Sequence, residues 1–135
     1  MRSKFLGIDP GRSKTGLALV DDAGAILSLH VAQTARLKEE LAAFAGSESL
    51  GRVIIGDGTN SRDVSAVVKE VFPDLKLETV VETHSTEEAR CLYWQEKPPR
   101  GWRRFVPQGL LVPPEPLDAY AAVVLVRRWL KRNRV

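Results

Sequence analysis

The sequence predicts an α/β fold, a mixed five-stranded sheet whose first three strands are antiparallel, with helices on both faces. Two patterns lead to this prediction. The opening of the chain holds three apolar runs separated only by turns, which is typical of an antiparallel meander. Farther on, helical periodicities separate the apolar runs, as right-handed crossovers between parallel strands require. With 135 residues, 44% of them hydrophobic, the chain is expected to form one domain, 1–135.

The first three strands are expected at residues 4–9, 15–20 and 25–32. Residues 4–9 have the sequence KFLGID, an apolar run that ends in a carboxylate, and Pro10-Gly11 then turns the chain. The sequence DDAG joins the second run to the third and is rich in turn formers. These turns predict a meander in which Asp9 lies at the end of the first strand.

Two helices and two strands are expected to alternate next. Apolar residues at helical spacing predict a first helix through Leu37, Leu41, Phe44 and Ala45. A short strand at 52–55 leads into a polar loop at 56–60. A second helix, which Pro73 ends, takes its apolar face from Val64, Val67, Val68, Val71 and Phe72. The fifth strand is expected at 75–81.

The remainder of the chain predicts two helices joined by an irregular connection. A third helix is expected to begin at Ser85, which has the Ncap-to-N3 spacing to Glu88 that a capping box requires. Residues 97–116 contain six prolines and two glycines, so no regular element is expected there. A final helix is expected over 117–131.

Composition narrows the classes of protein. A two-domain nucleotide clamp or a barrel enzyme would need roughly 250 residues. One cysteine, Cys91, and two histidines, His30 and His84, argue against a disulfide or a zinc centre. No apolar run reaches the ~18 residues that span a membrane, and no signal-peptide core follows the start. The expected location is therefore the cytoplasm.

The formal net charge of +3 hides an uneven distribution. Residues 1–96 carry 11 basic and 15 acidic side chains, whereas residues 97–135 carry 9 basic and 2 acidic ones. A basic segment that follows a weakly acidic body favours a polyanionic partner such as nucleic acid.

Four carboxylates stand at strand or helix ends: Asp9, Asp57, Glu82 and Asp118. Ligand sites in sheets of this kind lie at the carboxyl ends of strands. Taken singly, Asp9 could only shape a turn, and Glu82 could be a solvated strand-end residue. Asp118 shares a helical face with apolar residues, so it either needs a donor or a metal or complements the helix dipole. Together, acids on converging elements favour one shared site.

Carboxylates without a thiolate or histidine cluster suit one kind of metal chemistry. Mg²⁺ and Mn²⁺ prefer oxygen ligands, and structural zinc does not. Phosphoryl transfer by two such ions requires a set of this kind. The expected cofactor is therefore a pair of Mg²⁺ or Mn²⁺ ions.

Three runs in this order cover almost the whole chain: 7–11 (GIDPG) with 16–18 (GLA), 81–89 (VETHSTEEA), and 117–122 (LDAYAA). They resemble the signature blocks of the YqgF/RuvX family, related to RuvC. That family is described as Holliday junction resolvases and as nucleases that process pre-16S rRNA, with a ribonuclease H-like fold. The resemblance implies a nuclease of the ribonuclease H-like superfamily.

Residue by residue, the resemblance implies that Asp9 bridges the metals while Glu82 and Asp118 complete the catalytic set. RuvC-type resolvases place an acid after strand four, which makes Asp57 a candidate fourth ligand. The chain departs from the family at Val81, where an acid is usual, and in the loop at 56–61, which lacks the usual proline. These departures leave the substrate open between DNA junctions and rRNA.

Candidate nucleic-acid-binding residues form two sets. Beside the acids stand Arg12, Ser13, Lys14 and His84, which either contact phosphate or belong to a solvated turn and an ordinary helix start. The basic connection contains Arg100, Trp102, Arg103 and Arg104, cations interleaved with aromatics as in single-strand binding surfaces. Trp102 either stacks on a base or anchors the loop.

The leading hypothesis is a Mg²⁺- or Mn²⁺-dependent nuclease that acts, as a monomer or homodimer, on branched DNA or precursor rRNA. One alternative is a non-catalytic nucleic-acid or ribosome-associated module of the same fold. A lesser alternative takes residues 7–16 as the phosphate-binding hairpin of actin-like proteins and sugar kinases. Those proteins clamp ATP between two related domains, whereas this chain is long enough for only one domain, which counts against this alternative.

Overall fold

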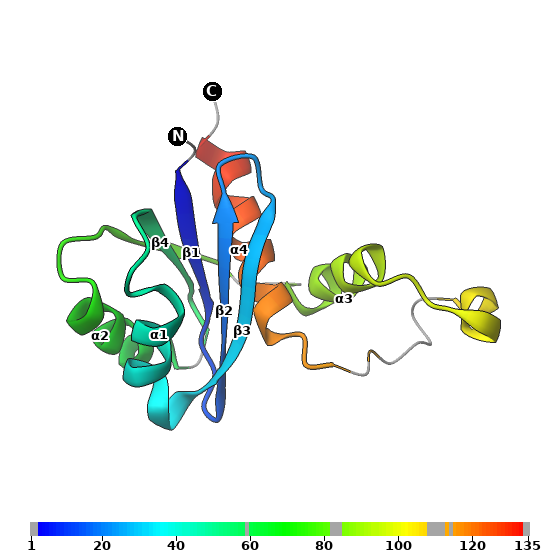
Figure 1. The fold of residues 1–135 in the computed structure, drawn as a ribbon, viewed down its shortest axis with the longest axis horizontal. Helices are drawn as coiled ribbons and strands as arrows, with labels where there is room; N and C mark the ends of the chain where they lie inside the picture. The colour runs from blue at the N-terminus through cyan, green and yellow to red at the C-terminus, as the bar shows by residue number, and fades with distance from the viewer. Residues whose placement is uncertain (1–2, 59, 82–84, 108–112, 114, 134–135) are drawn as a thin grey trace.

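The computed structural model describes residues 3–58, 60–81, 85–107, 113 and 115–133 (Figure 1). Three antiparallel strands open the chain: β1 (Lys4–Asp9), β2 (Lys14–Asp21) and β3 (Ile26–Gln33). The pairing of β1 with β2 sets Asp9 opposite Gly16. The meander expected from the sequence is confirmed, with strand ends that differ by one residue.

Two parallel strands extend the sheet on the other side of β1. They are β4 (Leu50–Gly56), which pairs with β1, and β5 (Leu77–Val80), which pairs with β4. The order across the sheet is β3-β2-β1-β4-β5. The predicted fold class, a mixed five-stranded sheet with its first three strands antiparallel, is therefore confirmed.

Two helices cover one face of the sheet, α1 (Leu37–Ala45) and α2 (Ser61–Val71) (Figure 1). They pack on alternate residues of the strands, among them Leu6, Ile8 and Ile55, which are all but fully buried. Removing a side chain of that size from water contributes about 1.5–3 kcal/mol. The two helices and these strand residues form the first of two cores.

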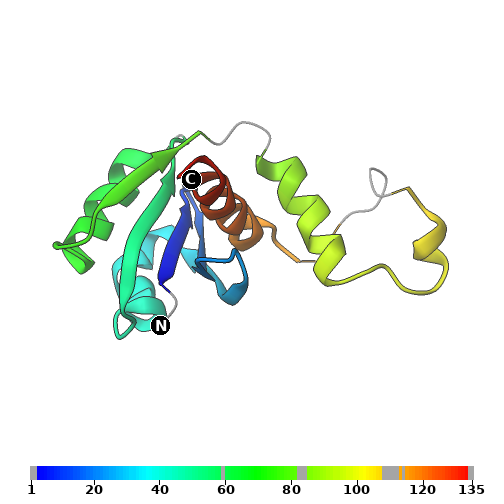
Figure 2. The same cartoon turned by 90° about the horizontal axis from the view of Figure 1, so that it is seen from above.

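The second core lies on the opposite face, under α4 (Asp118–Asn133). The helix α3 (Ser85–Glu96) packs on the side of α4 that points away from the sheet (Figure 2). Residues 119–126 of α4 are all buried, because the sheet covers one side of the helix and α3 covers the other. The apolar face predicted for this helix does pack inward.

Glycines in the strands let α4 lie directly on the sheet. A Cβ atom added to Gly7 would come within 3.0 Å of the carbonyl oxygen of Ala122, and one added to Gly16 would come still closer to the carbonyl oxygen of Asp118. Any side chain at these two positions would push the helix away. The backbone of α4 therefore touches β1 and β2 from its first turn onward.

The helix α3 begins at Ser85, as the sequence predicts, and the carboxylate of Glu88 accepts a hydrogen bond from Arg128. One local expectation needs correction. The connection after α3 is not wholly irregular, because Gly101–Phe105 form a 3-10 helix. Among the described residues, no helix is long and apolar enough to cross a membrane.

Candidate functional site

Asp9 and Asp118 come together at one edge of the sheet. Asp9 is the last residue of β1, and its cross-strand partner Gly16 lies against the backbone of Asp118. Asp9 also shares the alternation of Phe5 and Gly7, which face α4. Both aspartates are half-buried. The contact between Gly16 and α4 thus brings the backbone of Asp118, at the start of α4, close to the strand pair that ends at Asp9.

The turn that follows Asp9 is tied to two other loops. The Thr34 hydroxyl donates to the carbonyl oxygen of Gly11 at 2.9 Å, and the Asn60 side-chain amide donates to the same oxygen at 3.0 Å. Thr34 also hydrogen-bonds the hydroxyl of fully buried Thr15 at 2.8 Å. These bonds fix the backbone directly after Asp9 and join the loops after β1 and β4.

Asp57 lies at the same edge, directly after β4. Its backbone N–H donates to the carbonyl oxygen of Val80 at 3.1 Å, so the pairing of β4 with β5 extends to this residue. Asp57 is exposed. Because β4 runs parallel to β1, with Ile8 opposite Ile55, Asp57 stands at the carboxyl ends of the strands as the sequence predicts.

Glu82 and His84 lie outside the described residues. Of their neighbours, Val81 is 55% exposed and Ser85 is buried. Within the described part of the chain, no three His, Cys, Asp or Glu residues lie close enough together to hold a metal ion. A metal set that includes Glu82 therefore stays a prediction.

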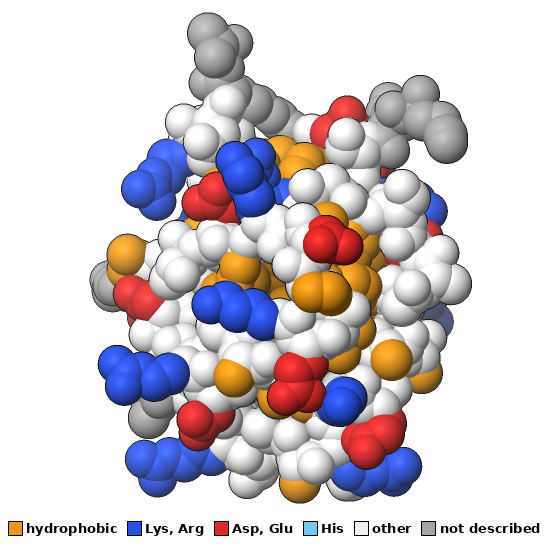
Figure 3. Space-filling view, turned by 90° about the vertical axis from the view of Figure 1, so that its left-hand side faces the viewer, with side chains coloured by type: hydrophobic (Ala, Val, Ile, Leu, Met, Phe, Trp, Pro, Cys, Tyr) orange, Lys and Arg blue, Asp and Glu red, His pale blue; other side chains and the backbone are white. Residues whose placement is uncertain are grey.

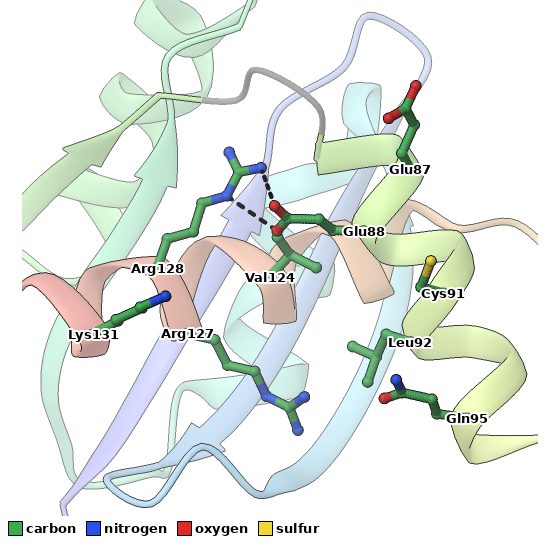
Figure 4. Close-up of a pocket in the computed structure, with 9 residues that line it drawn as sticks. All are labelled: Glu87, Glu88, Cys91, Leu92, Gln95, Val124, Arg127, Arg128 and Lys131. Atoms are coloured by element: carbon green, nitrogen blue, oxygen red, sulfur yellow. Dashed lines mark hydrogen bonds and ion pairs between the residues drawn. The ribbon is translucent and has the colours of Figure 1, made fainter.

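Arg128 of α4 joins three segments near this edge. Its guanidinium donates to the carbonyl oxygen of Val81 at 2.8 Å and forms an ion pair with Glu88 of α3 at 3.0 Å. Figure 4 shows this pair in a groove of about 510 Å³ between α3 and α4. Arg128 thus holds the residue that precedes Glu82, a role that the sequence pattern of basic residues does not reveal.

The cations and polar residues predicted to contact phosphate are accessible. Arg12, Ser13 and Lys14 are exposed on the turn that follows Asp9, and no described residue forms a hydrogen bond or ion pair with the side chain of Arg12 or Lys14. The side of the molecule over α1, α2 and β4 carries acids and bases close together instead (Figure 3). The turn after Asp9 therefore presents cations that are not paired with an acid among the described residues.

The second predicted set lies far from the sheet, beyond α3 (Figure 1). Arg100, Trp102, Arg103 and Arg104 are all exposed. Trp102 is 73% exposed, which rules out the interpretation that it anchors the connection. The structure leaves the ring available to a partner.

Comparison with known proteins gives one full-length match in sequence. Models of known protein families give no match. A protein named "Putative pre-16S rRNA nuclease" from Chlorobium luteolum is 28% identical over 145 residues, which cover 98% of this chain and 97% of that protein. This similarity agrees with the resemblance carried by the three sequence runs.

Solved structures match the fold. RuvC of Thermus thermophilus has a TM-score of 0.58 at 14% identity, covering 90% of each chain. Its complex with a Holliday junction substrate gives 0.57 at 16%, covering 98% of each chain. Fowlpox virus resolvase bound to Holliday junction DNA gives 0.60 at 9%, covering 96% of this chain and 97% of the resolvase. The chain therefore has the ribonuclease H-like fold of the RuvC resolvases. Over nearly its whole length it is also a distant homologue of a protein that is named a putative pre-16S rRNA nuclease.

Proposed function

We propose that this protein is a metal-dependent nuclease that hydrolyses phosphodiester bonds in structured nucleic acid. The observation that carries the proposal is the approach of Asp118 to Asp9 across Gly16. Two half-buried carboxylates, held by backbone packing at the carboxyl end of a central strand, offer the oxygen ligands that a divalent cation prefers. If Asp9 only shaped a turn and Asp118 only complemented the helix dipole, the two residues would not have to lie on closely packed segments.

The residues fit Mg²⁺ or Mn²⁺. The set consists of carboxylates, which supply oxygen ligands: Asp9, Asp118 and Glu82, with Asp57 at the same edge as a candidate fourth. The only cysteine of the sequence, Cys91, lies on α3, so the set includes no thiolate that would favour a softer metal. Two such ions, when bound, stabilise the attacking and leaving oxygens of a phosphodiester together. In this proposal, Asp9, Glu82 and Asp118 would hold the ions, with Asp9 at the centre of the set.

The chain's own cations would hold the substrate. Arg12 and Lys14 are exposed next to Asp9, without an ion-pair partner among the described residues, so both can bind the phosphates that flank the reacting bond. Ser13 can donate to a phosphate oxygen in the same turn. His84, two residues after Glu82 in the sequence, is a further candidate phosphate contact.

The names of the sequence and structural relatives support two classes of substrate. The curated relative is named for pre-16S rRNA, and two structural relatives are solved with Holliday junctions. We accordingly propose branched DNA or an rRNA precursor as the substrate. Both contain departures from a continuous duplex, which is the shared feature that an enzyme of this fold could recognise.

The test compares cleavage by matched carboxamide variants. Labelled four-way junction DNA and a pre-16S rRNA fragment are incubated with Mn²⁺ and with wild-type protein, Asp9→Asn or Asp118→Asn. The control is Asp74→Asn, which changes an exposed acid before β5, at the opposite edge of the sheet. We expect Asp9→Asn and Asp118→Asn to lose cleavage while Asp74→Asn keeps it and all three retain the wild-type circular dichroism spectrum.

Two results would contradict the proposal. Cleavage by Asp9→Asn at the wild-type rate would remove Asp9 from the mechanism. Tight binding of both nucleic acids by wild-type protein, without cleavage in Mn²⁺ or Mg²⁺, would identify a non-catalytic binding module of this fold.

A further inference from the structure

Two large aromatic rings stand exposed at the tip of the segment that projects beyond α3. Trp102 is 73% exposed and Phe105 is 77% exposed. Both belong to the 3-10 helix Gly101–Phe105, which lies at the end of the molecule farthest from the sheet (Figures 1 and 2). Leaving rings of this size in water forgoes the stabilisation of their burial, which points to a partner.

The local backbone presents the two rings together. Gly101 has φ +64°, a conformation that side chains disfavour, and it starts the 3-10 helix at this point. In a 3-10 helix, side chains three residues apart project in the same direction. Trp102 and Phe105 have this spacing, so one side of the tip carries both rings.

Guanidinium groups accompany the rings. The Arg103 guanidinium carbon lies 6.0 Å from the centre of the Trp102 ring, and that of Arg104 lies 4.9 Å from the centre of the Phe105 ring. Residues 97–107 contain no acid, and Arg100, Arg103 and Arg104 form no ion pair with a described residue. The tip therefore combines two open aromatic faces with three unneutralised cations.

We infer that this tip binds unpaired nucleotides of the substrate, with bases stacked on Trp102 and Phe105 and phosphates bound by the three arginines. Stacked bases and a phosphate chain offer the planar apolar faces and the negative charge that this arrangement complements. Bases of a continuous duplex are already stacked on one another, so they offer no free face. The inference rests on the proposed nuclease function and narrows its substrate to nucleic acid with an unpaired stretch.

A membrane or a second copy of the chain fits the tip less well. Two rings give little apolar area compared with the long apolar face of a helix that binds a lipid surface. A stable interface between copies would have to bury three cations, and the tip supplies no acids to pair with them. Charge complementarity thus favours a polyanion.

The test measures binding in EDTA, so that cleavage does not intervene. Fluorescently labelled single-stranded (dT)15 or (U)15 and a 15-base-pair duplex are titrated with full-length wild-type protein, Trp102→Ala, Trp102→Phe or Phe105→Ala. The control is Leu27→Ala, which removes another exposed apolar side chain. Leu27 is 48% exposed and lies on β3, in the sheet and not at the tip. Each alanine variant at the tip should weaken single-strand binding about 5- to 150-fold, the range that corresponds to loss of one stacked base.

The controls separate stacking from a general effect on the fold. Trp102→Phe keeps a ring and should retain most of the binding, and Leu27→Ala should bind as wild type does. Intrinsic fluorescence gives a second measurement, because Trp94 is buried and Trp102 is exposed. Single strand should quench the emission of wild-type protein more than that of Trp102→Phe.

Three outcomes would overturn the inference. Equal loss of single-strand and duplex binding would make the tip a general phosphate contact. Unchanged binding by both alanine variants would exclude the tip from the interface. Loss of a dimer or of binding to anionic vesicles in Trp102→Ala, with single-strand binding intact, would identify the other partners. Single-strand binding that depends on Trp102 without any nuclease activity would instead contradict the proposed function alone.

Discussion

Gly16 of β2 lies against the carbonyl oxygen of Asp118, so closely that a Cβ atom on Gly16 would come within 3.0 Å of it. Because Gly16 is also the cross-strand neighbour of Asp9, this contact determines where the first turn of α4 lies relative to the end of β1. One residue without a side chain thus controls the separation of two candidate metal ligands.

The first prediction concerns this contact. Gly16→Ala should lower the free energy of unfolding by about 1–3 kcal/mol, because its methyl group must displace helix backbone. It should also reduce Mn²⁺-dependent cleavage at temperatures where the protein remains folded. Gly51→Ala is the control, since its added Cβ would have no neighbour closer than 3.6 Å. Urea titration of both variants measures the difference, and equal stability would refute the role given to Gly16.

The second prediction concerns the turn after Asp9. Thr34→Val removes the donor to the Gly11 carbonyl and leaves the buried Thr15 hydroxyl without its partner, so it should cost about 1–3 kcal/mol. Thr79→Val, at an exposed position of β5, should change stability by less than about 0.5 kcal/mol.

A double variant sharpens this second prediction. Adding Thr15→Val to Thr34→Val should restore part of the stability, because no buried hydroxyl is then left unsatisfied. The Gly11 carbonyl keeps its hydrogen bond from Asn60 in both variants. Strictly additive losses in urea titration would show that the two hydroxyls do not act as a pair.

The third prediction concerns Arg128. Glu88→Gln should change stability by less than about 1 kcal/mol, because Glu88 is about half exposed and the pair is screened by water. Arg128→Gln removes the bond to the Val81 carbonyl as well and should lower cleavage by tenfold or more, since small displacements of catalytic groups are costly. Steady-state cleavage and urea titration separate the two effects. Equal activity of both variants would argue against a role for the bond to Val81.

The fourth prediction concerns pH. Hydrogen bonds from His30 and from the backbone N–H of Gln33 hold the pKa of Glu40 below its ordinary value of 4.5. The stabilisation that Glu40 gives is therefore present above pH 4.5 and is lost as the pH falls through the lowered pKa. A carboxyl NMR titration should show the low pKa in wild-type protein and a higher pKa in His30→Gln. An unchanged Glu40 titration in His30→Gln would contradict the assignment.

Much of the fold follows from local patterns along the chain. Alternation and turn residues are enough to indicate the three opening strands, because each strand buries a face that its own residues specify. Helical spacing likewise indicates α1, α2 and α4. The strand ends in the structure differ from the predicted ends by one or two residues, since the last hydrogen bonds of a strand depend on the neighbouring strands.

The candidate site divides in the same way. Local patterns along the chain are enough to place Asp9 and Asp57 at strand ends and Asp118 at a helix start, because the change from an apolar run to a polar residue is a local signal. Three relationships could be seen only in the folded chain: Asp118 lies against Gly16, the cross-strand neighbour of Asp9; Thr34 and Asn60 both bind the turn after Asp9; and Trp102 is exposed to water. Those relationships join segments far apart in the chain, and they are set by how closely helix and sheet backbones can pack.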